Sequence, residues 1–563
     1  MGKSRCWKPG IVACLCLLTA VLLAFSAAGA GEQRAKNVIV LIVDGCSSEQ
    51  YTLARWYKQA PLCLDGILVG ALKTFISDSV VADSAPAASA FATGVRTSDK
   101  FISVGPGENT IPPVPKPPPE LQYRPLATVL EGARLLGKAT GIAVTARVSH
   151  ATPAAYLAHT PSRTLEADIM EQAVYQNIDV VFGGGKNLLI PREAGGQRQD
   201  GEDLRTVLQQ KGYRIIGSVE EMNLIDSGRV FGIFADSHMA AEIDRKQLAP
   251  TEPTLAEMTA KAIEILAKDP DGFFLMVEAS QVDWACHAND PAHLISDLLM
   301  FDEAVKTAVD FARKDDNTLV LAFSDHNTGG FSVGNMATSG SYSQMTPDAL
   351  LRPLRNMTAS APLMWKHLGD ERTPARVKAV VKTDWGLEIT DEDASRILAL
   401  AERDKSAPHN AFGEVICARY TNLGWTSHGH VGGDVPLFAY GPGKPAGLLD
   451  GPDIGRVIAD ALGLNLDKLN QRLFAEAEAS LEGAAVAIDR GDPENPVIKI
   501  EYRGAVAQLP VNKNLLQIGD QAIELEGVVV YAPNTQKAYV PLQAVNILKG
   551  ASDPLPSVVK EGT

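Results

Sequence analysis

Six short apolar runs, rich in β-branched residues, recur along this 563-residue chain, and each ends abruptly in polar or glycine residues. Because polar residues do not alternate with apolar ones inside them, these runs fit strands that are covered on both faces. Helical patterns lie between them, such as the apolar stripe from Leu294 to Ala312. Strands alternating with helices predict an α/β fold with a large, mostly parallel sheet sandwiched by helices. The runs are 37–45, 141–147, 179–185, 272–280, 318–326 and 435–443.

Carboxylates and histidines stand at or near the ends of several predicted strands. In an open parallel sheet, ligands bind beyond the carboxyl ends of the strands. Any one of these residues alone would be interpreted as a turn residue or a hydrogen-bonded histidine, but their common position at one edge favours a metal centre. Carboxylates with imidazoles are typical Zn²⁺ ligands where thiolates are absent, and an all-oxygen set suits Mg²⁺. The residues are Asp44, Glu278, Asp283, His287, Asp325, His326, His428 and His430.

The stretch DSAPAASA, residues 83–90, has the composition of a helix start. Asp83 or Ser84 can supply an oxygen that caps the helix, and Pro86 is tolerated in the first turn, where its missing N–H has no partner. The same position would place the Ser84 hydroxyl at a helix N-terminus, where a reactive group is favoured. The residues of this stretch leave both interpretations open.

The first 30 residues have the pattern of a secretory signal peptide. Lys3, Arg5 and Lys8 precede an apolar run over 11–25, and Ala28-Gly29-Ala30 offers a cleavage site. A membrane anchor is the alternative, but the run is short and no second apolar span follows. We therefore expect a periplasmic or secreted protein with no membrane anchor after cleavage.

The charge balance constrains the partners of the chain. The formal net charge is −15, and loss of the three cations in residues 1–30 makes it −18. Such a chain is not expected to bind nucleic acid as a specific partner, and an anionic substrate would need local positive charge. The four cysteines after residue 30 allow up to two disulfides or a set of buried thiols, and both remain open. They are Cys46, Cys63, Cys286 and Cys417.

The chain is long enough for one large unit and an appendage. We expect a catalytic domain over 31–490, with a polar, Gly- and Ser-rich insertion at about 331–425 that lies over the active edge of the sheet. A helical pattern at 470–481 precedes the turn-rich GDPENP, residues 491–496. Beyond it, alternating residues predict antiparallel strands, so 494–563 is expected to form a small β-rich module.

Six motifs, in order, resemble those of the alkaline phosphatase family over residues 37–465. They are VDG (43–45), DSAPAASAFATG (83–94), HATPAAYLAHTPSR (150–163), VEASQVDWACH (277–287), SDH (324–326) and GHVGGDVPLFAYGPG (429–443). Each motif alone is modestly specific, whereas six in order with matching internal spacings are highly specific. The family's site residues can therefore be assigned by position.

The resemblance implies two Zn²⁺ ions, one Mg²⁺ ion and a serine nucleophile. One zinc would be held by Asp283, His287 and His430, and the second by Asp44, Asp325 and His326. Asp44 would also reach the magnesium, which Thr152 and Glu278 bind, while His428 stays outside the ligand set. Ser84 would attack phosphorus and Arg163 would hold the phosphate, so that phosphate monoesters are hydrolysed through a phosphoserine. The resemblance also implies a homodimer.

Two positions near the implied substrate site vary within the family. His150 stands where some bacterial members have Asp, which leaves the metal of the third site open between Mg²⁺ and another divalent ion. Trp284 stands where many members have Lys or His. Because tryptophan carries no charge, we expect phosphate to bind more weakly than in members with lysine. Two alternatives remain: a phosphodiesterase or sulfatase of the same superfamily, and a noncatalytic exported protein that binds phosphate or metal.

Overall fold

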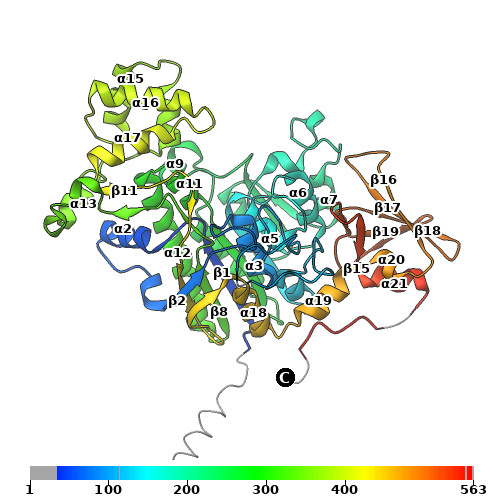
Figure 1. Cartoon of the computed structure of the whole chain (residues 1–563). Coiled ribbons are helices and arrows are strands. Elements are labelled where there is room, and N and C mark those ends of the chain that lie inside the picture. Colours follow the sequence, from blue (N-terminus) through cyan, green and yellow to red (C-terminus); the bar gives the residue numbers. More distant parts are fainter. Residues whose placement is uncertain (1–33, 113, 552–553, 561–563) are drawn as a thin grey trace, which may run out of the picture.

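The computed structural model describes residues 34–112, 114–551 and 554–560 (Figure 1). The signal peptide expected over 1–30 lies outside these residues. Within them, no helix combines the length and the apolar character needed to cross a membrane.

A ten-stranded sheet forms the centre of the molecule, and it confirms the predicted α/β fold. The central strand β1 runs parallel to both of its neighbours, β7 and β8. Strand β13 runs antiparallel to β8 and to β2, so the sheet is mixed but mostly parallel. In order across the sheet, the strands are β14 (Gly447–Asp450), β2 (Leu68–Lys73), β13 (Val435–Tyr440), β8 (Thr318–Phe323), β1 (Asn37–Val43), β7 (Phe273–Ala279), β3 (Ala139–Arg147), β4 (Val180–Gly184), β6 (Val230–Ala235) and β5 (Arg214–Ile216).

The two faces of the sheet have separate hydrophobic cores, which explains why its strands are apolar throughout. In β1, Ile39 and Leu41 belong to one core, and Val38 and Val40 to the other. The first core includes helices α2 (Ser48–Lys58), α10 (Leu255–Leu266) and α12 (Pro291–Asp315), the last of which contains the predicted apolar stripe. The second includes α3 (Ser84–Thr93), α4 (Val129–Leu135), α5 (Ala151–Leu157) and α18 (Gly451–Leu462).

The segment expected to be an insertion, 331–425, contains a set of short helices. Three of them, α15, α16 and α17, stand together at the upper left of Figure 1. The helix α17 contacts the loops next to the sheet edge, since Glu414 lies 3.3 Å from Nε2 of His428. The helices of this segment are α13 (Pro347–Leu351), α14 (Ala361–Leu368), α15 (Pro374–Asp384), α16 (Asp391–Arg403) and α17 (Asn410–Tyr420).

The C-terminal region contains small antiparallel sheets, as expected. Five strands, β16 (Ala485–Asp489), β17 (Val497–Tyr502), β18 (Ala505–Pro510), β19 (Leu515–Ile518) and β20 (Gln521–Glu524), form one sheet. Strands β15 (Ala475–Glu476), β22 (Lys537–Val540) and β21 (Val530–Ala532) form another, followed by α21 (Leu542–Lys549).

The prediction of one helix over 470–481 is wrong, because the structure divides this segment into two helices. Helix α19 (Leu466–Leu473) ends at Leu473, and the short helix α20 (Ala477–Ser480) follows. Between them, Ala475 in β15 pairs with Val540 in β22. Backbone pairing with a strand distant in sequence overrides the local helical pattern.

The cysteines within the described residues are free thiols. Cys46, Cys286 and Cys417 are buried, and Cys63 is partly buried. The sequence left disulfides and buried thiols open, and the structure has free thiols.

Candidate active site

The carboxyl ends of three adjacent strands bring the predicted carboxylates together. Asp44 directly follows β1, Glu278 is the penultimate residue of β7, and Asp325 lies two residues beyond β8. All three side chains are fully buried. Glycine is required directly after Asp44. The φ of Gly45 is +75°, and a Cβ atom at this position would lie only 2.6 Å from Oδ1 of Asp283, another of the predicted ligands.

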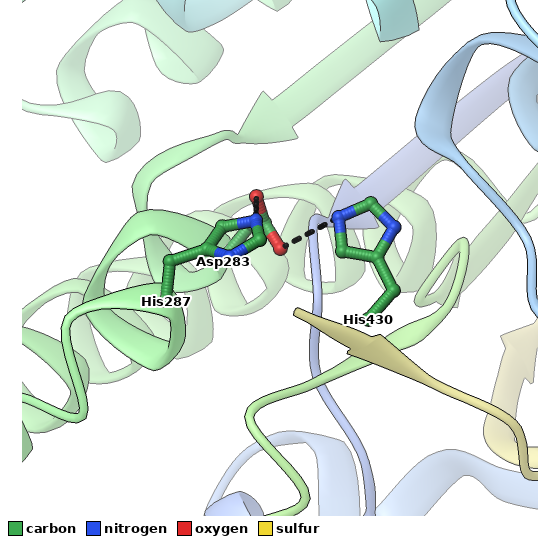
Figure 2. A group of neighbouring side chains, drawn as sticks. All are labelled: Asp283, His287 and His430. Carbon is green, nitrogen blue, oxygen red and sulfur yellow. Dashed lines mark ion pairs between the residues drawn. The ribbon is translucent and has the colours of Figure 1, made fainter. Parts of the chain in front are cut away.

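Asp283, His287 and His430 form the first group of candidate metal ligands (Figure 2). Asp283 and His287 lie one turn apart on α11 (Gln281–His287), with Oδ2 and Nε2 3.1 Å apart. His430 comes from β12 (His430–Val431), and its Nε2 is 3.7 Å from Oδ1 of Asp283. Nδ1 of His287 contacts the carbonyl of His428, and Nδ1 of His430 donates to the carbonyl of Ala82. With Nδ1 on a carbonyl oxygen, each ring is oriented so that its Nε2 faces the carboxylate of Asp283, the orientation in which both imidazoles and the carboxylate could bind one metal ion.

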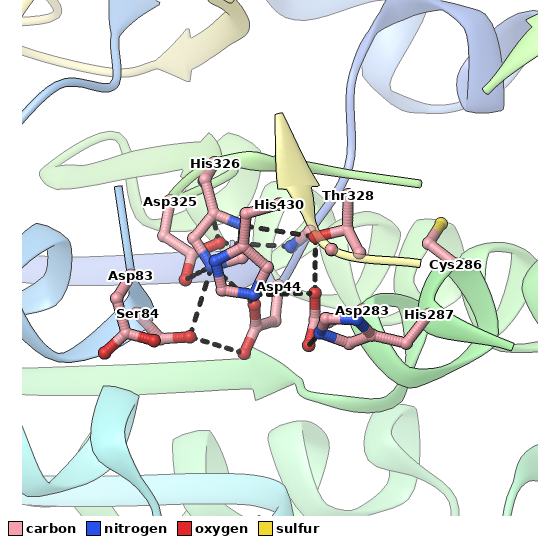
Figure 3. Close-up of polar contacts among 12 residues, drawn as sticks. Asp44, Asp83, Ser84, Asp283, Cys286, His287, Asp325, His326, Thr328 and His430 are labelled. Carbon is pink, nitrogen blue, oxygen red and sulfur yellow. Dashed lines mark hydrogen bonds and ion pairs between the residues drawn. The ribbon is translucent and has the colours of Figure 1, made fainter. Parts of the chain in front are cut away.

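Asp44, Asp325 and His326 form the second group (Figure 3). Nε2 of His326 lies 3.5 Å from Oδ1 of Asp44 and 3.3 Å from Oδ2 of Asp325. The hydroxyl of Thr328 donates to Asp283 at 2.5 Å and lies 3.2 Å from Nδ1 of His326. Because the Thr328 hydroxyl donates its hydrogen to Asp283, it must accept a hydrogen bond from Nδ1–H of His326. The lone pair of Nε2 of His326 is then available to a metal ion.

A third group contains Asp44, Glu278 and His150. Oδ1 of Asp44, both carboxylate oxygens of Glu278, the hydroxyl of Thr152 and Nδ1 of His150 are buried and make no hydrogen bond. Buried polar atoms without partners are costly, so a cation among them fits this donor set. The electrostatics agree: burial and the nearby carboxylates raise the pKa of Asp44 well above its usual value, and burial followed by Asp325 raises the pKa of Glu278 to about 8.

Ser84 is the first residue of α3 and lies against the second group (Figure 3). Its Oγ is 3.2 Å from Nε2 of His326 and 3.4 Å from Oδ2 of Asp44. The backbone is extended at Asp83 and turns helical at Ser84, and the small side chains that follow are all buried. The prediction that a side-chain oxygen of Asp83 or Ser84 caps the helix is wrong, because no side chain accepts a capping hydrogen bond at the start of α3. Asp83 accepts a hydrogen bond from Arg163 instead.

The guanidinium of Arg163 lies beside the start of α3. Its Nη1 donates to Oδ1 of Asp83 at 2.6 Å, and its Nη2 is 3.1 Å from Nε2 of His150. Since guanidinium can only donate, Nε2 of His150 is the acceptor. The side chain is about a quarter exposed, at 23%. The structure thus brings Ser84, Arg163 and His150 to one place.

Trp284 packs against two histidine rings. Its ring centroid is 5.6 Å from that of His150 and 4.2 Å from that of His238. The backbone N–H of Arg147 donates to Nδ1 of His238. Trp284 and His150, both assigned near the substrate, are therefore adjacent.

Three residues of the site were not found from the sequence. Thr328 connects His326 to Asp283, His238 packs on Trp284, and Asp83 holds Arg163. Thr328 and His238 have ordinary local patterns, and only the fold brings them to the site. Asp83 stands next to Ser84 in the sequence, but nothing local indicates its contact with Arg163. His428 lies outside all three groups: its Nδ1 donates to the carbonyl of His287.

A mostly parallel sheet with a buried serine, an arginine and three groups of candidate metal ligands at its carboxyl edge is the arrangement expected of an α/β enzyme with metal-dependent chemistry at that edge. The family model for alkaline phosphatase matches residues 35–464. Alkaline phosphatase 3 of Bacillus subtilis is 33% identical over 464 residues, covering 78% of this chain and 92% of that protein. The chain belongs to the alkaline phosphatase family and is an enzyme of that kind, a phosphatase.

Solved structures agree with this assignment. The crystal structure of Thermus thermophilus alkaline phosphatase matches with a TM-score of 0.68 and 29% identity, covering 77% of this chain and 92% of that one. A mutant alkaline phosphatase from the Antarctic bacterium TAB5, with Mg bound in its M3 site, matches with a TM-score of 0.54 and 26% identity, covering 77% of this chain and 99% of that one.

Proposed function

We propose that this enzyme hydrolyses phosphate monoesters by transferring the phosphoryl group to Ser84 and then to water. The observation that carries the proposal is the position of the Ser84 hydroxyl, within 3.4 Å of two candidate metal ligands and at the start of a ten-residue helix. A protein that only bound phosphate or metal would not need a hydroxyl at this point.

The donor sets support two zinc sites and one magnesium site. Asp283, His287 and His430 would hold one zinc, and Asp44, Asp325 and His326 the other. Asp44, Thr152 and Glu278 would hold magnesium, because their unpaired oxygens form an all-oxygen donor set. The similar mutant TAB5 enzyme has Mg bound in one of its own sites. When bound, such cations lower the pKa of a nearby hydroxyl and stabilise the attacking and leaving oxygens of the displacement.

The residues of the chain supply the remaining elements of catalysis. Ser84 is the first residue of α3, where the positive end of the helix dipole favours negative charge. The fork of Arg163 can bind two oxygens of the phosphate, and Asp83 holds that fork on one side. His150 accepts from Arg163 on the other side and fixes its plane.

The alternatives within the superfamily are a phosphodiesterase and a sulfatase. Arg163 and the third metal group favour the monoesterase, because both suit a dianionic substrate. The test is turnover of a matched aryl phosphate monoester, diester and sulfate by protein reconstituted with Zn²⁺ and Mg²⁺. We expect the monoester to dominate, whereas a dominant diester or sulfate rate would reject the proposal, and no turnover of any of them would favour a binding protein.

Export, assembly and domain boundaries are further parts of the proposal. The signal pattern over 1–30 supports a periplasmic or secreted enzyme, and the family resemblance supports a homodimer. We assign the catalytic domain to 31–490, with its insertion at about 331–425, and the C-terminal module to 494–563. The strands β15 and β16, which pair with strands of this module, come before residue 490.

A further inference from the structure

His159 is a fully buried histidine four residues before Arg163. Its Nε2 lies 3.2 Å from Oε1 of Glu131, and its Nδ1 lies 3.2 Å from the carbonyl oxygen of Ser103. The ring is thus held at both nitrogens, by the Glu131 carboxyl on one side and a backbone carbonyl on the other. His159 and Glu131 form a buried pair, and the side chains of both residues are 0% exposed.

Glu131 makes a full set of hydrogen bonds around this pair. Its Oε2 accepts from the backbone N–H of Thr128 in the capping box of α4, and its Oε1 also accepts from Gln176. Burial alone would raise the pKa of Glu131, but the charge and hydrogen bond of His159 lower it below its usual value, so the carboxylate stays ionised. A buried ion pair persists when its remaining polar atoms are satisfied in this way.

The loop that follows His159 connects the pair to Arg163. Thr160 exchanges two backbone hydrogen bonds of 3.0 Å with Ile102, and the N–H of Arg163 donates to the carbonyl of Lys100 at 2.8 Å. Ser103, which accepts from His159, belongs to the same segment, 100–103. Segments 100–103 and 159–163 therefore lie side by side. The His159 ring fixes the end at Ser103, and Arg163 lies at the end at Lys100.

The same segment is attached to the helix that carries Ser84. The hydroxyl of Ser89 on α3 donates to the carbonyl of Phe101 and accepts from the N–H of Ser103. One continuous set of hydrogen bonds therefore sets the position of Arg163 relative to Ser84.

Residues from the C-terminal part of the chain also contact His159 and its neighbour Gln172. The backbone N–H of His159 donates to Gln172, whose amide donates to Asn512 at 3.0 Å. The ring of Phe474 lies 4.6 Å from that of His159, centroid to centroid.

We propose that His159, paired with Glu131, is a positioning residue that holds the 159–163 loop so that Arg163 meets the phosphate of the substrate. This inference rests on the proposed function. It assigns a role in the reaction to a buried pair that contacts neither the nucleophile nor the metal-binding side chains.

A double-mutant cycle between His159→Gln and Arg163→Ala tests the proposal. With an aryl monoester, His159→Gln should lower kcat/KM by roughly tenfold or more, with the phosphate inhibition constant rising in parallel. In the Arg163→Ala background, the same substitution should change kcat/KM by about twofold at most, because its effect acts through the arginine. The slower hydrolysis of a matched diester, which carries one negative charge, should fall less than that of the monoester.

Controls separate positioning from loss of structure. His293→Gln removes another fully buried histidine, on α12, and should leave kcat/KM unchanged. If His159→Gln does not fold, Glu131→Gln replaces it in the same cycle, with metal content and thermal unfolding measured for every variant. Equal losses with and without Arg163, or equal losses for monoester and diester, would overturn the positioning role. Absence of any Ser84-dependent monoester turnover in the wild type would instead overturn the proposed function.

Discussion

The guanidinium of Arg163 donates a 2.6 Å hydrogen bond to the carboxylate of Asp83, the residue directly before Ser84. The residue directly before α3 thus holds the side chain that we propose binds the phosphate. An arginine side chain loses much rotamer freedom when it is held, so an existing partner reduces the entropy that substrate binding must still remove.

Asp83→Ala should weaken phosphate binding while leaving the nucleophile in place. Without its partner, Arg163 is less well oriented, so we expect KM and the phosphate inhibition constant to rise by about three- to tenfold, or about 1 kcal/mol, with kcat largely retained. Steady-state kinetics of Asp83→Ala and of Asp99→Ala, an exposed aspartate whose carboxylate lies 3.5 Å from Nζ of Lys100, would measure this. An unchanged inhibition constant in Asp83→Ala would show that Asp83 does not orient Arg163.

Trp284→Lys should tighten phosphate binding. Trp284 packs on His150, which itself contacts Arg163, so a lysine there would add a positive charge near the bound phosphate. A gain on the order of 1 kcal/mol corresponds to a phosphate inhibition constant about fivefold to tenfold lower. Trp284→Phe is the matched control, since it keeps an aromatic ring without charge and should not tighten binding. If the lysine variant binds phosphate no more tightly than the phenylalanine variant, the explanation is wrong.

Glu278→Gln should remove one metal ion per chain and leave the other two sites filled. The substitution keeps the size of the side chain but removes a charge from the third group, where both carboxylate oxygens lack hydrogen bonds. Elemental analysis of dialysed protein would measure the loss. The control is Glu171→Gln in another acidic cluster, with Asp200 and Glu202, whose charge is balanced by Lys513 and Arg198. This control should not alter metal content, and an unchanged content in Glu278→Gln would contradict the assignment of the third site.

The sheet and most of the site could be predicted because their signals are local in the sequence. A strand buried on both faces is apolar at every position, as in 37–43, and a carboxylate at its end is visible without knowledge of its neighbours. Asp283 and His287 are one helical turn apart, so their common face follows from spacing alone.

The remaining features depend on contacts between distant parts of the chain. Thr328 has no local signal of its contacts with His326 and Asp283, and Asp83 meets Arg163 across 80 residues. The helix expected at 470–481 is interrupted because Ala475 pairs with Val540, which no local pattern reveals. The partner that fixes each of these elements is set by tertiary packing.

The stability of the insertion should depend on pH through Asp393. Burial alone would raise the pKa of this carboxyl, but hydrogen bonds from Tyr420, Thr390 and Arg419 lower it to about 2. A depressed pKa contributes stability that is fully present above the unfolded value of about 4 and is lost as the pH falls toward 2. Asp393→Asn should therefore lower the free energy of unfolding by about 2 kcal/mol at pH 7, and by progressively less below pH 4.

Urea unfolding at several pH values would measure this difference. The control is Asp391→Asn on the same helix, whose side chain is exposed and pairs with Lys378, and which should cost far less. A difference between wild type and Asp393→Asn that stays constant from pH 7 to pH 3 would contradict the assigned role of the carboxylate.

The central claim is that Ser84 accepts the phosphoryl group, and trapping the intermediate tests it most directly. Metal-reconstituted enzyme would be mixed with an aryl phosphate monoester, quenched in acid, digested and analysed by mass spectrometry. We predict one added phosphoryl group on the peptide that contains Ser84, and neither the modification nor normal turnover in a Ser84→Ala variant with unchanged metal content. Normal turnover by Ser84→Ala, or a phosphoryl group on another residue, would contradict the account.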